Sequence, residues 1–363
     1  MPTPILSCAD DRLDASLARA VEVLRAGGLV AFPTETVYGL GANALDADAV
    51  RRIFAAKGRP ATNPVIVHVA TIEQVALVAS DWPDDAARLA AAFWPGPLTL
   101  VLPRRPEVPD VVTAGGPTVA VRIPAHPVAL RLLEALGLPI AAPSANRSNR
   151  LSPTTAEHVY ADLNGRIDLL LDAGPTSGGI ESTVVDVTTR PARLLRLGLI
   201  DPAAIERIIG PIRRPVVPLA LVLGGEGLGV RGRVTAREAP LTPDPSPPEY
   251  RGRGEKEFPL PSPGMLSRHY APRTPLECVE GDGMTRVDEL LAAGLRVAVV
   301  TRRSRPEGVR TLTMPADPAG YAARLYAALH LLDAEGFDRL IVELPPDEDA
   351  WLAVRDRLRR ASS

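Results

Sequence analysis

Short apolar runs alternate with amphipathic stretches along most of this 363-residue chain, and this alternation limits the fold more than any other feature. Apolar residues recur at helical spacing in 13–24 and in 46–57. Each of these stretches precedes a short apolar run, 29–32 and 65–69, that is typical of a buried strand. Because strands and helices follow one another in this way, the sequence predicts an α/β domain.

The same alternation continues to about residue 210. Further helices are predicted at 84–93 and 127–136 and after Ser152 and Pro153, and further strands at 98–102, 118–123, 139–142, 167–171, 183–187 and 192–197. The last two strands follow each other without a helix between them. Because a regular doubly wound fold needs a helix at each crossover, we expect a mixed, twisted sheet instead.

The composition changes after residue 210. Residues 241–248 and 251–254 are so rich in proline and glycine that they cannot build a packed core. We therefore predict a first domain at 1–210, a Pro/Gly-rich linker at 211–262 and a second domain at 263–363. In the second domain, strands are expected at 275–279, 296–301 and 339–343, and helices at 287–293, 319–335 and 349–360. This order predicts a small Rossmann-like α/β domain with a mostly parallel sheet.

Charge and cysteine content argue against several classes of protein. The net charge of -2 and the pI near 6.3 give no reason to expect bulk electrostatic binding to nucleic acid or to a membrane surface. Cys8 and Cys278 lie far apart without metal-ligand neighbours, so we expect no zinc module or disulfide framework and a cytoplasmic location. Asp10 and Asp11 are wrong for a signal peptide, and no membrane role is expected.

Lys57 is one of two lysines in a chain that otherwise uses arginine. It lies close to Arg59, between a predicted helix and a predicted strand, where a cation can bind phosphate. The alternative is a basic helix end that the helix dipole favours. Because lysine is so rare here, we favour the phosphate site.

The common nucleotide-binding motifs are absent from the sequence. Neither lysine precedes serine or threonine as a P-loop requires, no predicted strand is followed by G-x-G-x-x-G, and H-E-x-x-H does not occur. What remains are four polar loops at predicted strand ends, 33–41, 57–60, 63–64 and 144–146. A single polar side chain in them could be a cap or a turn former, but the four loops together predict a ligand site.

Six segments in these regions carry a family resemblance. The stretches PTETVYGLGA, KGRPATNPVIVH, FWPGPLTLVL, TVAVRIP, APSAN and GIESTVVDV occur in this order. They resemble the YrdC-like family of L-threonylcarbamoyladenylate synthases over residues 15–210. Residues 262–265 and 269–272 are similar to the start of the extra C-terminal domain in the longer, two-domain members.

The resemblance implies a nucleotidyltransferase. Its reaction would convert L-threonine, bicarbonate or carbon dioxide, and ATP into threonylcarbamoyl-AMP and pyrophosphate, with Mg²⁺ carried in by ATP and no metal held by the protein alone. The product would serve the threonylcarbamoyladenosine modification of tRNA, so tRNA and a downstream threonylcarbamoyl transferase are possible partners. Such chemistry needs the α-phosphorus of ATP exposed beside a carboxylated amino group.

The resemblance also assigns residues. ATP would be bound by Lys57, Arg59, Asn63, Thr118, Ser144, Asn146, Ser152, Arg196 and Tyr270, with Lys57 and Arg59 as the catalytic pair. L-Threonine would be bound by Thr34, Thr36, His68, Arg122 and Ser182. Arg122 suits the carboxylate as a two-pronged donor, whereas without the resemblance His68 would be read as a core histidine and Ser152 as a helix cap.

Glu35, Glu181, Tyr38 and Asn149 are four further positions with an expected role. Glu35 and Glu181 would orient water or magnesium, with surface or capping roles as the alternative. Tyr38 is expected to pack at the sheet edge. Asn149 stands where the family usually has glycine, and asparagine best tolerates the left-handed backbone that such a loop needs. Tyr270 resembles a linker tyrosine that closes over the nucleotide.

Two other functions are compatible with parts of the sequence. One is an RNA-binding module without turnover, which the net charge of -2 disfavours. The other is carbamoyl transfer for hydrogenase maturation, which uses a related domain but adds cysteine-rich zinc segments that this chain lacks.

Overall fold

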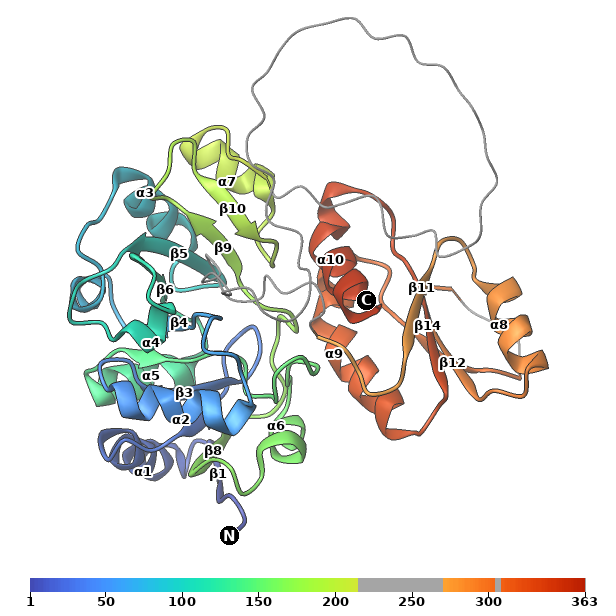
Figure 1. Cartoon of the computed structure of the whole chain (residues 1–363), viewed down its shortest axis with the longest axis horizontal. Coiled ribbons are helices and arrows are strands. Elements are labelled where there is room, and N and C mark those ends of the chain that lie inside the picture. The colour runs from blue at the N-terminus through green and yellow to red at the C-terminus, as the bar shows by residue number, and fades with distance from the viewer. Residues whose placement is uncertain (215–269, 304–307, 363) are drawn as a thin grey trace, which may run out of the picture. The chain divides into compact units, whose positions relative to one another are not determined.

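The structure, a computed structural model, describes residues 1–214, 270–303 and 308–362. The first range contains a ten-stranded sheet, and the other two contribute a four-stranded sheet (Figure 1). Most of the predicted linker, together with residues 262–265 and His269, lies outside the described residues.

The larger sheet is mixed. Its strands are β1 (Ile5–Ser7), β2 (Val30–Phe32), β3 (Gly39–Asn43), β4 (Ile66–His68), β5 (Leu98–Pro103), β6 (Thr118–Arg122), β7 (Ile140–Ala141), β8 (Leu169–Asp172), β9 (Thr183–Asp186) and β10 (Arg193–Arg196), in the spatial order β1-β8-β2-β3-β7-β4-β6-β5-β9-β10. Parallel pairs such as β4 with β6 stand beside antiparallel pairs such as β5 with β6. The expected mixed sheet is confirmed.

Helices cover both faces of this sheet. They are α1 (Leu13–Arg25), α2 (Ala47–Lys57), α3 (Asp84–Phe93), α4 (Asp110–Thr113), α5 (Pro127–Leu136), α6 (Ala156–Leu163) and α7 (Pro202–Ile209), with the 3-10 turn η1 (Glu73–Leu77). In β2, Ala31 packs in the core with α2, α3 and α6, whereas Val30 and Phe32 pack with α1 and α5. Alternate residues of a strand point to opposite faces, so both faces of β2 are buried.

The smaller sheet is parallel throughout. It has the order β11-β14-β12-β13, from β11 (Leu276–Val279), β12 (Val297–Thr301), β13 (Arg310–Thr313) and β14 (Arg339–Glu343). Helix α8 (Met284–Ala292) packs on one face, and α9 (Pro318–Ala334) and α10 (Leu352–Ser362), preceded by the turn η2 (Asp349–Trp351), pack on the other. The expected Rossmann-like domain is confirmed, with β13 as an unpredicted edge strand.

One local prediction about the larger sheet was wrong. The helix expected after Ser152 and Pro153 begins only at Ala156, because Thr155 is the N-cap and the Ser152 hydroxyl donates to a carboxylate instead. Ile212 is buried and the backbone of Arg213 is hydrogen-bonded to Leu194, so the packed chain continues beyond residue 210.

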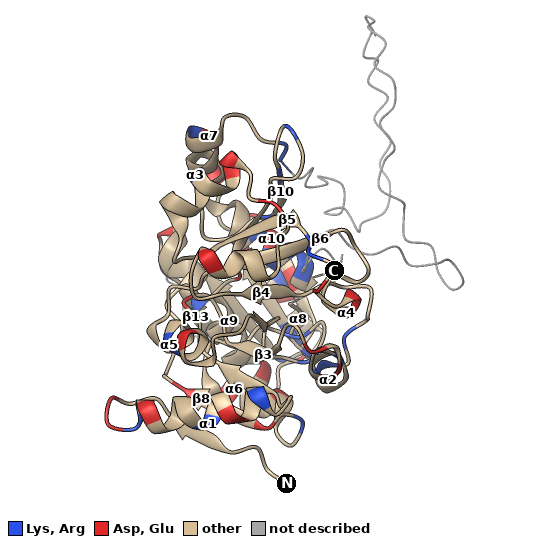
Figure 2. Ribbon diagram, turned by 90° about the vertical axis from the view of Figure 1, so that its left-hand side faces the viewer, with Lys and Arg blue, Asp and Glu red and all other residues tan. Residues whose placement is uncertain are grey.

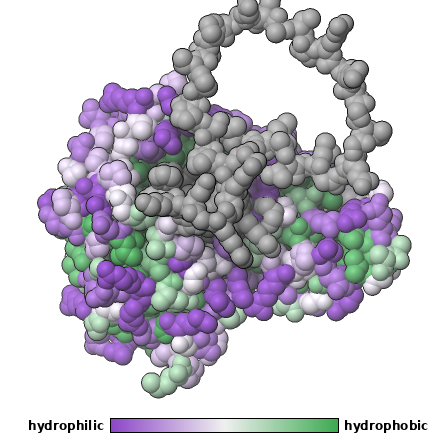
Figure 3. All heavy atoms as spheres, in the orientation of Figure 1, coloured by the Kyte–Doolittle hydropathy of each residue, from purple (hydrophilic) through white to green (hydrophobic). Residues whose placement is uncertain are grey.

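Neither one sign of charge nor one kind of hydropathy dominates the views in Figures 2 and 3. Charges of both signs alternate along the ribbon in Figure 2, and hydrophobic patches are interspersed with hydrophilic ones on the face in Figure 3. Within the described ranges, no helix combines the length and the apolar character that crossing a membrane requires.

Candidate active site

A pocket that is partly open to solvent lies on one face of the larger sheet. Its lining residues are Thr34, Thr36, Val37, Gly39, Arg59, Ile66, His68, Arg122, Ala142, Pro143, Ser144, Glu181, Ser182, Arg196 and Tyr270. The lining thus combines apolar side chains with hydroxyl groups and arginines that can orient a ligand.

Strand register explains why distant residues meet in the pocket. Ile66 and His68 are two residues apart in β4 and share one face, while Val67 points into the opposite core. In the neighbouring β6, Arg122 pairs with His68. This face of β4 and β6 therefore presents a histidine and an arginine side by side.

All five residues predicted to bind threonine line this one pocket, namely Thr34, Thr36, His68, Arg122 and Ser182. The chain brings them from positions 34 to 182 through β4, β6 and the loops that follow β2 and precede β9. Their assignment as threonine ligands remains a prediction.

Arg122 is held from three sides. Its Nε donates to the Gly96 carbonyl at 3.0 Å and its Nη1 to the Thr36 hydroxyl at 3.0 Å. Its Nη2 lies 2.6 Å from Oε1 of Glu35, an ion pair whose angle falls short of hydrogen-bond geometry. Glu35 thus orients an arginine, and the fixed guanidinium is preorganised for an anion.

A second arginine of the pocket is fixed by one residue of the loop before β9. Nε of Arg196 donates to the Ser182 carbonyl and its Nη2 to the Ser182 hydroxyl, both at 3.0 Å. The same hydroxyl is 2.8 Å from that of Thr99. A small displacement of Ser182 would therefore move Arg196.

Lys57 and Arg59, the predicted phosphate-binding pair, lie in different environments. Arg59 lines the pocket, with Nη2 donating to Oδ1 of Asn63 at 2.7 Å. Lys57 is 2 % exposed and does not line the pocket; its Nζ donates to the Ser144 carbonyl at 2.6 Å and to the Asn146 carbonyl. Lys57 thereby supports the loop that presents Ser144.

Of the nine residues predicted to bind ATP, four line the pocket, Arg59, Ser144, Arg196 and Tyr270. Asn63 and Asn146 contact Arg59 and Lys57 from behind. Thr118 begins β6 two residues before Ala120, whose partner in β4 is the pocket residue Ile66. These positions remain predictions as ATP ligands.

Burial and neighbouring charges set the ionisation of the site. Burial, followed by Arg122, lowers the pKa of His68 to about 3, and burial lowers the pKa of Arg59 to about 10. For Glu181, burial acts to raise the pKa, but Arg357 and Arg196 outweigh it and the pKa is lowered. The pocket therefore combines a neutral histidine, an ionised Glu181 and three arginines, a balance that suits anions.

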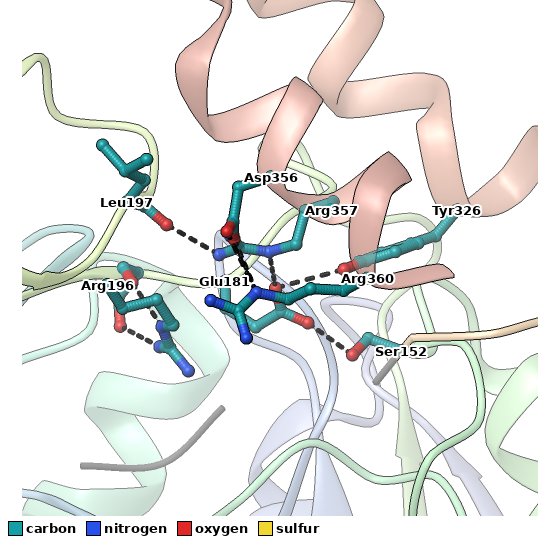
Figure 4. Close-up of polar contacts among 9 residues, drawn as sticks. Ser152, Glu181, Arg196, Leu197, Tyr326, Asp356, Arg357 and Arg360 are labelled. Carbon is teal, nitrogen blue, oxygen red and sulfur yellow. Dashed lines mark hydrogen bonds and ion pairs between the residues drawn. The ribbon is translucent and has the colours of Figure 1, made fainter. Parts of the chain in front are cut away.

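Sequence reasoning underestimated Glu181 and missed its partners from the C-terminal sheet region. Glu181 is 6 % exposed and accepts from the Ser152 hydroxyl, from Tyr326 at 3.2 Å and from Nε of Arg357 at 2.7 Å (Figure 4). Arg357 lies in a helix rich in charged residues, which is usually a solvated face. No local signal linked it to Glu181.

Two predictions about backbone and packing can be compared with the structure. Asn149 has φ of 66°, so the expected left-handed backbone is confirmed. Tyr38 was expected to pack at the sheet edge; it is fully buried in the main core, directly before the inner strand β3, and its hydroxyl donates to the Gly174 carbonyl at 2.7 Å.

A resident metal ion would need several carboxylate, imidazole or thiolate ligands around it. Within the described ranges, no group of three or more His, Cys, Asp or Glu side chains is arranged to hold a metal ion. The two carboxylates near the pocket, Glu35 and Glu181, are each paired with an arginine.

Known proteins resemble the chain over nearly its whole length. Family models described as "Telomere recombination" and "Threonylcarbamoyl-AMP synthase, C-terminal domain" match residues 22–198 and 232–363. The threonylcarbamoyl-AMP synthase of Pyrococcus abyssi is 43 % identical over 351 residues, which cover 94 % of this chain and 93 % of the relative. The chain belongs to the threonylcarbamoyl-AMP synthase family. It is therefore an enzyme of a nucleotide-using family, as predicted.

Two further members extend this result. The threonylcarbamoyl-AMP synthase of Bacillus subtilis is 41 % identical over 358 residues, covering 96 % of this chain and 93 % of the relative. A crystal structure of P. abyssi Sua5 complexed with L-threonine superposes with a TM-score of 0.83 at 38 % identity, covering 99 % of this chain and 97 % of that one. The two-sheet architecture is thus that of a solved family member.

Proposed function

We propose that the pocket joins L-threonine, bicarbonate or carbon dioxide, and ATP into threonylcarbamoyl-AMP and pyrophosphate. The observation that carries this proposal is the convergence of all five predicted threonine ligands on one pocket that also contains Arg59, Ser144 and Arg196. Family membership and the threonine complex of the P. abyssi relative support the same substrate.

The proposed chemistry has two bond-forming steps. The neutral threonine amine attacks carbon dioxide and loses a proton to solvent, which gives a carbamate. A carbamate oxygen then attacks the α-phosphorus of ATP, with pyrophosphate as the leaving group. Arg59 and Arg196 would offset the charge of the phosphates, and Arg122 would hold the threonine carboxylate. His68 would act as a neutral hydrogen-bond partner, since a pKa of about 3 makes it too weak a base to take the ammonium proton.

Magnesium is proposed as part of the nucleotide substrate. Mg²⁺ is commonly bound through substrate phosphates and water rather than by a protein cage, and it would supply charge neutralisation at the triphosphate. We further propose a cytoplasmic reaction, because ATP and tRNA are available there and the free thiols of Cys8 and Cys278 suit a reducing compartment. The product would pass to a threonylcarbamoyl transferase that modifies tRNA.

The decisive experiment is pyrophosphate release from ATP with magnesium and bicarbonate, comparing L-threonine with L-serine, L-valine and no amino acid. Threonine-dependent release is expected. The Arg122→Lys variant keeps the charge but loses the two-pronged donor, so its KM for threonine should rise about tenfold or more. Folded protein that binds tRNA but releases no pyrophosphate would instead favour an RNA-binding module.

A further inference from the structure

Arg357 is a fully buried cation in helix α10, with a side-chain exposure of 0 %. A buried guanidinium is strongly unfavourable unless its donors are paired. Its Nε donates to Glu181 at 2.7 Å and its Nη2 to the Leu197 carbonyl at 2.7 Å, while Nη1 pairs with Asp356 in its own helix (Figure 4). Two of its three nitrogens therefore bind the part of the chain that carries the pocket.

The contact with Glu181 reaches the pocket directly. Glu181 lines the pocket, and so does the next residue, Ser182, which holds Arg196 through two hydrogen bonds. Because Glu181 and Ser182 are joined by one peptide bond, a shift of the carboxylate toward another partner would change the position of Arg196.

Arg357 also contacts Tyr270. Its guanidinium carbon lies 5.2 Å from the centre of the Tyr270 ring, a cation–π distance. The ring centres of Tyr270 and Tyr326 lie 5.8 Å apart, with an angle of 34° between the ring planes. Tyr270 lines the pocket and has φ of 64°, which is unfavourable for a bulky side chain. Such a backbone persists only where its surroundings restrain it.

We propose that Arg357 is a positioning residue for the active-site pocket, which it serves by fixing the Glu181 carboxylate and the Tyr270 ring. Helix α10 then supports a site that is lined by Tyr270 and by residues between positions 34 and 196. The inference rests on the proposed function only for the activity that is measured.

If Arg357 only stabilised helix α10, its loss should affect the pocket no more than the loss of another buried arginine of that helix. Arg355 provides this comparison. Arg355 lies in the same helix and is also buried, at 3 % exposure. Its partners are Glu280 at 3.0 Å, Asp347 at 3.2 Å and the Pro345 carbonyl, none of which lines the pocket. Loss of either arginine should destabilise the helix, but only loss of Arg357 should disturb the pocket.

The test compares Arg357→Met with Arg355→Met in the full-length protein. We expect the KM for ATP to rise at least about tenfold in Arg357→Met and to stay within about twofold of wild type in Arg355→Met, at matched folded fraction by circular dichroism. Arg357→Lys, which keeps one donor for Glu181, should be intermediate. Equal kinetic effects of the two methionine variants, or an unchanged KM in Arg357→Met, would overturn the proposal.

A second measurement does not depend on Arg357 variants being folded. Tyr326→Phe removes only the hydroxyl that donates to Glu181 at 3.2 Å, and a rise of about threefold in the KM for ATP is expected. An unchanged KM there would count against the Glu181 route. If wild-type protein releases no pyrophosphate, the proposed function fails; ATP affinities of the same variants, measured by calorimetry, still decide whether Arg357 positions the pocket.

Discussion

Lys57 supports the loop that carries Ser144. Burial and the nearby Arg59 lower its pKa well below the ordinary value, but Nζ is surrounded by the Ser144 carbonyl and two oxygens of Asn146, which favour the charged form. A lysine in this setting fixes its neighbours before a substrate arrives.

Replacement of Lys57 by alanine is expected to lower turnover about a hundredfold, because the loop that presents Ser144 loses a charged hydrogen-bond donor, and such a loss costs about 1.5–3 kcal/mol. Lys57→Met, which keeps more of the side-chain volume, should have a similar kinetic effect because both changes leave the buried carbonyls unpaired. The readout is kcat for threonine-dependent pyrophosphate release, with Lys256→Ala as the lysine control. Full activity of a folded Lys57→Ala protein would refute the role.

His68 makes stability depend on pH. Its pKa is about 3 in the fold against an ordinary value of 6.5, so the unfolded chain binds the proton more tightly. The free energy of unfolding therefore falls as the pH drops from about 6.5 toward 3, and His68 should account for about 2 kcal/mol of that loss by pH 5.

Urea denaturation of wild type and His68→Gln at pH 7.5 and pH 5 isolates this contribution, because His126, His158 and His330, whose pKa values are also lowered, are common to both proteins. The variant should lose less stability on acidification. An identical loss in both proteins would show that His68 does not carry the effect.

At the scale of elements, the capped start and the glycine end of helix α2 together fix the position of Lys57. The Asp46 carboxylate accepts from the backbone amides of Asp48 at 2.9 Å and Ala49 at 3.1 Å, and Gly58 ends the helix with φ of 62°. Lys57 is the last residue before that glycine. The cap at Asp46 and the glycine at position 58 therefore fix the helix whose last residue is Lys57.

Asp46→Ala is expected to lower the free energy of unfolding by about 1 kcal/mol, because two amides at the start of α2 lose their acceptor. Asp48→Ala, which removes only an exposed ion pair with Arg51, should have a smaller effect. Urea midpoints at constant m-value provide the comparison. Equal losses in the two variants would argue against the cap.

Most elements were predictable because their apolar periodicity is local, as in α3 and α5, whose bounds match the expected ranges. Strand β3 was not, since its sequence GLGAN has two glycines and little strand propensity. It forms because β2 and β7 pair with both of its edges, and a side chain at Gly41 would lie 2.8 Å from Phe32 and Ile140. Tertiary packing, which the local sequence does not contain, decided this element.

The residues of the site were likewise predictable only where the sequence signal is local. The five residues predicted to bind threonine lie in recognisable stretches between 34 and 182, and they line one pocket. The contact of Glu181 with Arg357, by contrast, spans 176 residues. Arg357 shares α10 with Arg355, Arg359 and Arg360, and nothing in that pattern distinguishes a buried cation from solvated ones. Such long-range pairs are set by how the two sheet regions pack.

At the scale of the whole molecule, the loop that carries Glu181 approaches helix α9 too closely for a side chain. A Cβ on Gly179 would lie 2.3 Å from the Ala322 carbonyl oxygen and 2.5 Å from Cα of Ala323. The rings of His158, in α6, and His330, in α9, also stack, with their centres 3.8 Å apart. Packing of α9 against this loop and the orientation of Glu181 should therefore change together.

Gly179→Ala is the variant that tests this coupling, and the chain offers a matched control. Gly174 has φ of 77°, close to the 74° of Gly179, but a Cβ there meets nothing within 4 Å. Gly174→Ala should thus suffer only backbone strain, about 1 kcal/mol, with an unchanged KM for ATP.

Gly179→Ala adds a clash with the backbone of α9 to that strain, so we expect a larger fall in the free energy of unfolding and a KM for ATP raised several-fold. Both quantities are measured at the same folded fraction. If the two alanine variants were equal in stability and in KM, the close approach of α9 would not matter to the pocket. A loss of stability in Gly179→Ala alone, with KM unchanged, would separate packing of the two sheet regions from positioning of Glu181.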